Sequence, residues 1–125
     1  MKVAVIGSRN FNDYDLLTMV LKGFKVKTIV SGGASGADSL AERFAKEHNI
    51  PIKIFKADWQ DFSEPCVIKV NNFGKYNALA GHKRNEKVVS DVDVVIAFWD
   101  GKSSGTKDAI KKAESKGITV TIVRF

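Results

Sequence analysis

Residues 26–48 read VKTIVSGGASGADSLAERFAKEH, which places an apolar run, a glycine-rich turn and an amphipathic segment in succession. Val26 to Val30 is short and apolar, as expected for a buried strand. Residues 31–36 contain only Ser, Gly and Ala. From Ala37 to His48, apolar side chains recur at helical spacing. A strand that passes through a tight turn into a helix is typical of a parallel α/β sheet.

The same alternation continues along the chain of 125 residues. Strands are predicted at 2–6, 26–30, 52–55, 93–99 and 118–123. Helices are predicted after an N-cap at Asn12, over 37–48, over about 78–89 and ahead of Gly117. The pattern predicts an α/β, Rossmann-like, doubly wound parallel sheet of about five strands, in the order 3-2-1-4-5, with helices on both faces. In that order, ligands bind at the carboxyl ends of strands 1 and 4, where the strand order reverses.

Residues 58–77 interrupt the alternation. They predict an irregular inserted loop, with at most a short strand at Val67 to Val70. A loop of this length in a compact domain is usually functional or mobile. Because no linker, repeat or low-complexity tract is visible, the sequence predicts a single domain over residues 1–125 that carries this insertion.

Composition argues against several classes of protein. Cys66 is the only cysteine and the two histidines, His48 and His82, lie far apart, so neither an internal disulfide nor a zinc-type cluster is expected. The first apolar stretch is too short for a signal peptide, and no segment has the length that crosses a bilayer. We therefore expect a cytoplasmic protein with no metal and no membrane partner.

The net charge of +6 favours a polyanionic partner, but its distribution weakens that argument. The lysines are scattered over several predicted elements, as is common on solvated surfaces. A nucleic-acid partner is accordingly a less favoured prediction than a small anion. Arginines are few, and both Arg9 and Arg84 fall inside motif-like segments.

Three turns, after predicted strands 1, 2 and 4, carry residues suited to a phosphate group. Small residues expose backbone N–H groups at a helix N-terminus, and arginine offers a planar fork of donors. The candidate residues are Gly7, Ser8 and Arg9; Ser31, Gly32, Gly33, Ala34, Gly36 and Asp38; and Asp100, Gly101, Ser103, Ser104, Gly105 and Thr106. Asp38 has two interpretations, either accepting from a ribose hydroxyl or capping backbone amides. We expect the three turns to converge on one site.

Five segments resemble the SLOG superfamily, specifically its YspA/YpsA-related branch. They are Gly-Ser-Arg-x-Phe-x-Asp at 7–13, Ser-Gly-Gly-Ala-x-Gly-Ala-Asp-x-Leu-Ala-Glu at 31–42, Ala-Asp-Trp at 57–59, Ala-Gly-x-x-Arg-Asn at 80–85 and Ala-Phe-Trp-Asp-Gly-x-Ser-x-Gly-Thr at 97–106. The resemblance implies a Rossmann-like domain that binds nucleotides or nucleotide-derived signals. Relatives include the LOG phosphoribohydrolases, which release the base from nucleoside monophosphates, and the DprA DNA-binding proteins. The branch occurs in bacteria and phages, and its relatives form dimers or higher oligomers, so a homo-oligomer is expected.

One departure from the LOG pattern bears on catalysis. LOG hydrolases carry Gly-Gly-x-Gly-Thr-x-x-Glu with a catalytic glutamate, and here Ala109 stands at that position. Arg84 matches their catalytic arginine, and Asn85 follows it. Asp108 is one residue away, on a different helical face, so we do not expect it to substitute. An arginine without its acid/base partner favours a binding protein over an enzyme.

The sequence therefore predicts a protein that binds a nucleotide or a nucleotide derivative, for sensing or sequestration, with no further cofactor. Arg9, Arg84 and the turn amides would hold phosphate, Asp38 or Asp100 would contact ribose, and Trp99 or the 58–77 loop would cover the base. One alternative is an N-glycosidic hydrolase in which Arg84 acts with one of three carboxylates, those of Asp38, Asp58 and Asp100. A second alternative is DprA-like nucleic-acid binding.

Overall fold

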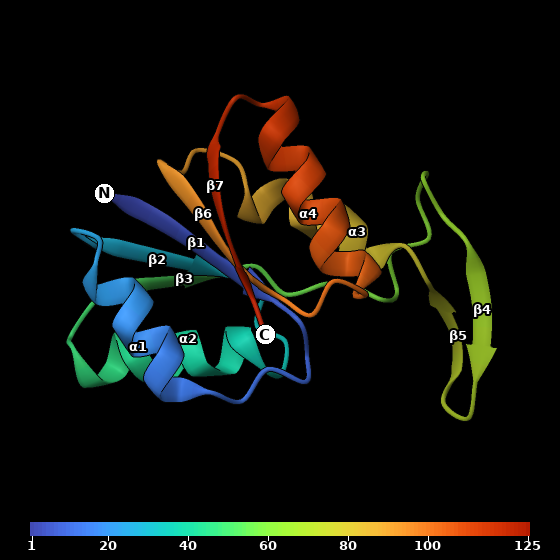
Figure 1. The fold of residues 1–125 in the computed structure, drawn as a ribbon. Coiled ribbons are helices and arrows are strands. Elements are labelled where there is room, and N and C mark those ends of the chain that lie inside the picture. Colours follow the sequence, from blue (N-terminus) through green and yellow to red (C-terminus); the bar gives the residue numbers. More distant parts are fainter.

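The computed structural model describes residues 1–125 and contains a central sheet of five strands (Figure 1). The strands of the sheet are β1 (Lys2–Gly7), β2 (Thr28–Ser31), β3 (Ile52–Ile54), β6 (Val94–Trp99) and β7 (Thr119–Arg124). They lie in the order β3-β2-β1-β6-β7, and every neighbouring pair is parallel. Once two strands of a separate hairpin are left out of the count, this is the predicted order 3-2-1-4-5. The doubly wound fold is confirmed.

Helices cover both faces of the sheet (Figure 1). The helices are α1 (Tyr14–Lys22), α2 (Ala37–Glu47), α3 (Ala80–Val88) and α4 (Ser104–Ser115). Along β1, Val3 and Val5 pack in the core under α1 and α2, while Ala4 and Ile6 pack in the core under α3 and α4. Because both faces of β1 are buried, its sequence is continuously apolar rather than alternating.

Two predicted helix starts are shifted in the structure. Helix α1 has Asp13 as its N-cap rather than Asn12, because the Asp13 carboxylate accepts a hydrogen bond of 3.0 Å from the amide of Leu16. Helix α3 spans nine residues inside the predicted range of 78–89. Its start is delayed because the Asn77 side chain accepts a hydrogen bond of 2.9 Å from the amide of Leu79.

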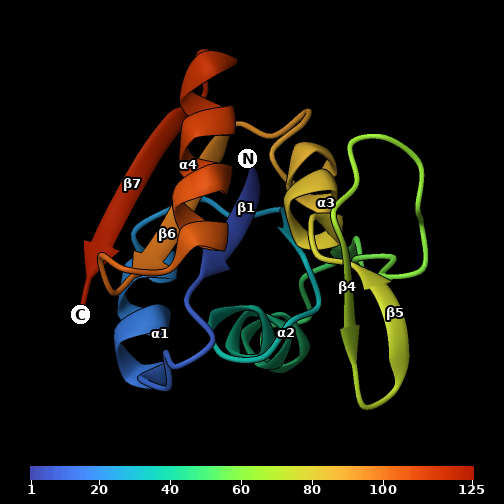
Figure 2. The same ribbon diagram turned by 90° about the vertical axis from the view of Figure 1, so that its right-hand side faces the viewer.

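Residues 58–77, which we call the hairpin arm, contain a regular element that the sequence did not predict in full. Strands β4 (Ile68–Asn71) and β5 (Gly74–Asn77) pair in antiparallel fashion. The expected strand at Val67 to Val70 therefore exists with a shift of one residue, and it has a partner. The hairpin projects from the sheet on the side of α3 (Figures 1 and 2). None of the four helices has the length and apolar composition needed to span a bilayer.

The base of the hairpin arm is organised around one buried amide. Asn77 has no exposed surface. Its Nδ2 donates to the carbonyl of Asp61 at 2.9 Å, and its Oδ1 accepts from the amide of Val67 at 3.1 Å as well as from Leu79. A buried amide that satisfies its donors and acceptors in this way fixes the segments that it joins. Asn77 therefore fastens both ends of the hairpin arm to the start of α3.

Candidate functional site

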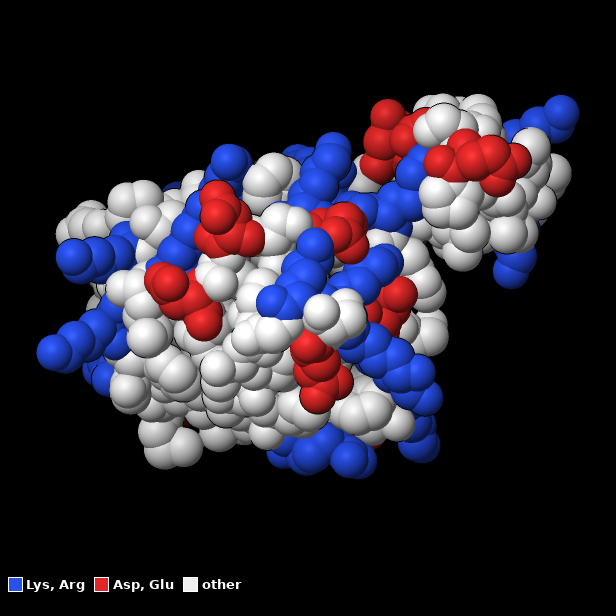
Figure 3. Space-filling view, turned by 90° about the horizontal axis from the view of Figure 1, so that it is seen from above, with Lys and Arg blue, Asp and Glu red and all other residues white.

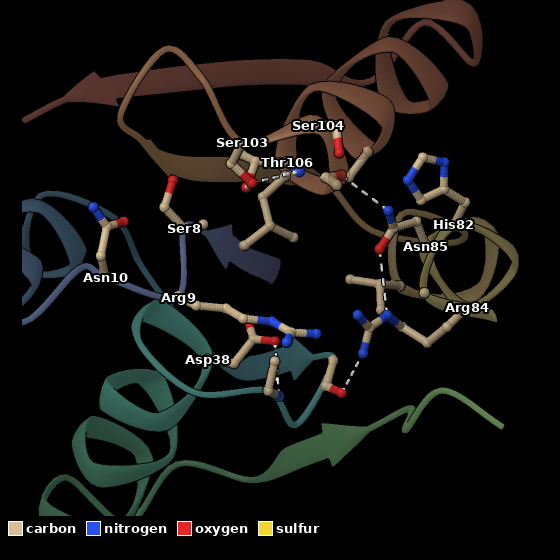
Figure 4. Close-up of a pocket in the computed structure, with 18 of the residues that line it drawn as sticks. Ser8, Arg9, Asn10, Asp38, His82, Arg84, Asn85, Ser103, Ser104 and Thr106 are labelled. Atoms are coloured by element: carbon tan, nitrogen blue, oxygen red, sulfur yellow. Dashed lines mark hydrogen bonds between the residues drawn. The ribbon is translucent and has the colours of Figure 1, made fainter. Parts of the chain in front are cut away.

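A pocket of about 460 Å³ lies at the switch point of the sheet, at the carboxyl ends of β1 and β6 (Figure 4). Its walls come from the turns after β1, β2 and β6 and from α3. A volume of this size is within the range of small-molecule sites, roughly 300–1,000 Å³. We call it the switch-point pocket.

The three predicted turns do converge, and most of the candidate residues line this pocket. Those in the lining are Gly7, Ser8, Arg9, Gly32, Ala34, Asp38, Arg84, Asn85, Asp100, Ser103, Ser104, Gly105 and Thr106. Those outside the lining are Ser31, Gly33, Gly36, Trp99 and Gly101. Each of the three turns thus contributes to one continuous surface.

Close packing of the turns against one another fixes the shape of the pocket. Ser8 is buried, its amide donates to the carbonyl of Phe98 at 2.9 Å, and its hydroxyl accepts from the amide of Asp100 at 3.2 Å. These bonds join the turn after β1 to the turn after β6. Gly36 has a φ of +74°, and a Cβ on it would lie 2.6 Å from the carbonyl oxygen of Arg9. Only glycine fits where these turns meet.

The N-terminus of α4 presents free amide groups to the pocket. The Ser103 hydroxyl caps the helix by accepting from the amide of Thr106, whereas the amides of Ser104 and Gly105 donate to no group of the protein. The Asp100 carboxylate accepts from the amides of Ser103 at 2.8 Å and Lys102 at 2.9 Å, and these bonds lower its pKa. Asp100 therefore closes the turn, and the unpaired amides beside it are donors of the kind that suits an anion.

Arg84 is held in a fixed position on the opposite wall. Its guanidinium donates to the carbonyl of Gly32, to that of Phe55 at 3.4 Å, and through Nε to Asn85 Oδ1 at 3.3 Å. A Cβ on Gly32 would lie 2.6 Å from the guanidinium carbon, so a side chain there would displace Arg84 from this position. Burial lowers the pKa of Arg84, and the nearby Asp38 carboxylate opposes that shift. The group stays protonated at neutral pH, as guanidinium groups do.

Asp38 is a buried carboxylate in the same wall. Its Oδ2 accepts from the amide of Ala34 at 3.1 Å, while its Oδ1 has no partner in the protein. Burial raises the pKa of Asp38, although the bond from Ala34 and the charges of Arg84 and Arg9 act in the other direction. Arg9 extends over Asp38 towards Arg84 (Figure 4). Capping of a backbone amide is thus seen, and one carboxylate oxygen is left for a ligand hydroxyl.

Asn85 connects α3 to α4, and this contact settles where Asp108 lies. Asn85 Nδ2 donates to the carbonyl of Gly105 at 3.0 Å and to Asp108 Oδ2 at 3.1 Å. The Asp108 carboxylate also pairs with Lys112 at 2.7 Å and is absent from the pocket lining, whereas Ala109 is part of it. No carboxylate therefore occupies the position where LOG hydrolases have their glutamate.

Two other candidates lie apart from the switch-point pocket. The Trp99 indole N–H donates to the carbonyl of Ser103 at 3.1 Å, and the Arg124 guanidinium carbon lies 5.4 Å from the centre of its ring. Trp99 is thus engaged on the β7 side. Asp58 is exposed, accepts from the amide of Gln60 at 3.1 Å and does not line the pocket.

Trp59 and His82, which the sequence also suggested as ligand contacts, line the pocket, and so does Asn10, which the sequence reasoning missed. Asn10 directly follows Arg9, so its place in the first turn was a usable signal. Trp59 belongs to the Ala-Asp-Trp segment at 57–59, and its aromatic ring made it, like Trp99, a candidate for stacking on a base. No group of three or more His, Cys, Asp and Glu side chains gathers in the structure.

Charges of both signs are interspersed on the face that Figure 3 presents. Lys and Arg side chains alternate there with Asp and Glu, and they do not merge into one positive surface. The arrangement agrees with the scattered lysines of the sequence. Within the pocket, by contrast, two arginines and the free amides of α4 lie close to a single buried carboxylate.

Comparisons with known proteins agree with this fold. The family model described as the YspA, cpYpsA-related SLOG family matches residues 1–62. Gene 61 protein of Mycobacterium phage D29 is 33% identical over 98 residues, which cover 74% of this chain and 67% of that protein. The X-ray structure of DNA processing protein A (DprA) from Streptococcus pneumoniae superposes with a TM-score of 0.74 over 99% of this chain, at 21% identity. This chain spans half the length of that DprA chain, and the likeness concerns the fold alone. The chain belongs to the YspA, cpYpsA-related SLOG family.

Proposed function

We propose that the protein binds a nucleotide or a nucleotide-derived small molecule in the switch-point pocket, and that it senses or sequesters this molecule. The observation that carries the proposal is that two kinds of hydrogen-bond donor suited to an anion face each other across one pocket. On one wall are the unpaired amides of Ser104 and Gly105, and on the other are the guanidinium groups of Arg9 and Arg84. Together they favour a phosphate between them.

The Asp38 carboxylate in the pocket suits the sugar of such a ligand. Asp38 Oδ1 is an acceptor without a partner, close to the arginines that would hold phosphate. Ribose hydroxyls donate short hydrogen bonds to a carboxylate. The Asp100 carboxylate is a second acceptor for this role, because both of its backbone bonds are to Oδ1.

The proposal is tested by incubating purified protein with mononucleotides, NAD, ADP-ribose and cyclic nucleotides, followed by mass spectrometry of bound and free fractions. We expect wild type to retain one class of intact compound. Arg9→Ala and Arg84→Ala should release it, whereas Lys87→Ala, which removes a charge from an exposed position of α3, should retain it. Failure of wild type to retain any compound contradicts the proposal.

Hydrolysis of an N-glycosidic bond is the second candidate, and one observation favours it. Burial raises the pKa of Asp38, which is the direction that a general acid requires. Free base in the supernatant of the same incubation would identify an enzyme. Asp38→Asn should then abolish base release and leave binding intact. Ala109 in the lining argues for binding without cleavage, because the LOG-type carboxylate is missing there.

Nucleic-acid binding is a weaker candidate. The resemblance to DNA processing protein A is its support, and the mixed charges of Figure 3 are against it. A protein that neutralises several phosphates loses affinity steeply with added salt. A shallow salt dependence of binding to single- or double-stranded DNA would therefore contradict this candidate.

A further inference from the structure

Trp59 is the one large aromatic side chain of the hairpin arm that lines the switch-point pocket. It keeps 39% of its surface exposed there. An indole that stays partly exposed at the pocket is not explained by core packing, because burial of that surface would stabilise the fold. The exposed indole is suited to a ligand with a flat apolar part.

The indole is placed directly beside the arginine wall. Gly81, in the first turn of α3, lies between Trp59 and Arg84. A Cβ added to Gly81 would be 3.6 Å from Trp59 Cη2 and 4.0 Å from Arg84 Nη2. The indole and the guanidinium therefore both lie within 4.0 Å of the same point beside Gly81. A single small molecule can contact both.

The rest of the hairpin arm holds Trp59 in this position. The amide of Asn77 donates to the Trp59 carbonyl at 2.8 Å, and Asn77 is itself buried and fully bonded at the base of the hairpin. The Tyr76 ring meets the indole edge-on, with 6.2 Å between the centroids and 71° between the planes. A recognition group that is fixed before the ligand arrives loses little entropy on binding.

From these contacts we infer that Trp59 is a specificity-determining residue, which stacks on the aromatic base of a 5′-phosphorylated nucleoside whose phosphate lies at Arg84. The inference rests on the proposed function and narrows it, since it requires a base as well as a phosphate. The hairpin arm then has a defined role, because it supplies the surface on which the base is read. Stacking accepts any base, so purines, with the larger ring, bind more tightly than pyrimidines.

Calorimetry with 5′-AMP, 5′-UMP and ribose 5-phosphate separates the base from the phosphate. Wild type should bind 5′-AMP about 10-fold more tightly than ribose 5-phosphate, the size of one stacking contact. Trp59→Ala should remove that advantage and leave the affinity for ribose 5-phosphate unchanged. Trp59→Phe keeps an aromatic ring and should retain most of it. Phe62→Ala is the matched control, because Phe62 is an arm aromatic with 41% exposure that does not line the pocket.

Tryptophan fluorescence gives an independent reading of the same contact. The chain has two tryptophans, so Trp59→Phe leaves Trp99 as the only indole. Binding of 5′-AMP should quench the emission of wild type and leave that of Trp59→Phe unchanged.

The outcomes distinguish the two claims. Equal affinity of wild type and Trp59→Ala for 5′-AMP, with ribose 5-phosphate still bound, overturns the role of Trp59 and leaves the proposed function standing. Binding of neither compound by wild type overturns the inference, and the proposed function is overturned with it only if wild type also retains no member of the wider nucleotide panel. Loss of ribose 5-phosphate binding in Trp59→Ala, with Trp59→Phe normal, makes the residue a support of the fold and also overturns the inference.

Discussion

Two phenylalanines show how differently the sheet body, residues 1–57 and 78–125, and the hairpin arm are held. Phe98 in β6 has no exposed surface and stacks on Phe11 with 4.6 Å between the ring centroids. Phe73, between β4 and β5, is 98% exposed. The sheet body is stabilised by apolar burial on both faces of the sheet, which scales with the area removed from water. The hairpin arm has no such core.

Polar contacts hold the hairpin arm instead. Besides the bonds of Asn77, Lys83 of α3 reaches the Asp61 carboxylate at 2.9 Å and the Ser63 carbonyl at 3.0 Å. The Ser63 hydroxyl and Lys83 hold the pKa of Asp61 well below its ordinary value. Such bonds fix the geometry of the arm at its base. The tip makes few buried contacts, so we expect it to open locally without unfolding of the sheet body. The sheet body therefore supplies both the stability of the fold and most of the pocket wall, and the hairpin arm adds Trp59 to that wall.

The largest effect is expected for Phe98→Ala. Removal of a fully buried aromatic ring leaves a cavity and costs about 3–5 kcal/mol. Urea denaturation of the variant and of wild type gives the difference in the free energy of unfolding. A loss below about 1 kcal/mol would contradict our account of the sheet body as the source of stability.

Asn77→Ala should have the next largest effect. The amides of Val67 and Leu79 and the carbonyl of Asp61 lose their partner, at a cost of about 1–3 kcal/mol. Limited proteolysis should cut residues 58–77 faster than in wild type. Asn71→Ala is the control, since that side chain is exposed and accepts only from the amide of Phe73. Equal cleavage of both variants would show that Asn77 does not fasten the hairpin arm.

Two carboxylates should give the sheet body and the hairpin arm opposite pH responses. Burial raises the pKa of Asp38 above 3.8, so its contribution to stability is full below that pH and is lost as the pH rises through its folded value. The pKa of Asp61 is lowered, so its contribution is present above 3.8 and is lost as the pH falls. From pH 7 to pH 3, wild type should gain stability relative to Asp38→Asn and lose it relative to Asp61→Asn. Denaturation at a series of pH values measures both trends, and trends of the same sign would contradict this assignment.

Phe73→Ala should have the smallest effect on the fold, within about 0.5 kcal/mol, because its ring makes no buried contact.

The same variant tests the homo-oligomer that we propose from the family resemblance. Light scattering should give a multimeric mass for wild type. A monomeric mass would contradict that proposal, and an unchanged multimer in Phe73→Ala would place the interface away from the tip of the arm.

The sequence was sufficient for the sheet because buried parallel strands are continuously apolar, as residues 3–6 and 94–98 are. It placed β4 one residue early and missed β5, because the residues of β5 carry no hydrophobic period. The glycine and serine turns marked the pocket because the carboxyl ends of parallel strands share one edge.

Individual side chains were harder to place from the sequence. Trp99 stands at such a strand end, yet the bond from its indole to the Ser103 carbonyl turns it away from the pocket. Trp59 is held at the pocket by a hydrogen bond from the amide of Asn77 to its carbonyl. The two residues are distant in the chain, so no local sequence pattern encodes this contact.

The central position of β1 has a consequence for synthesis of the chain. Val3 pairs with Ile29 on one side and with Val94 on the other. Until the ribosome has delivered β6, the first strand has one open, apolar edge, and such edges recruit other strands. The first 62 residues carry two of the three turns of the switch-point pocket but neither Arg84 nor α4. Between the synthesis of β2 and that of β6, a nascent chain therefore has only part of the switch-point pocket and an edge that needs protection from aggregation.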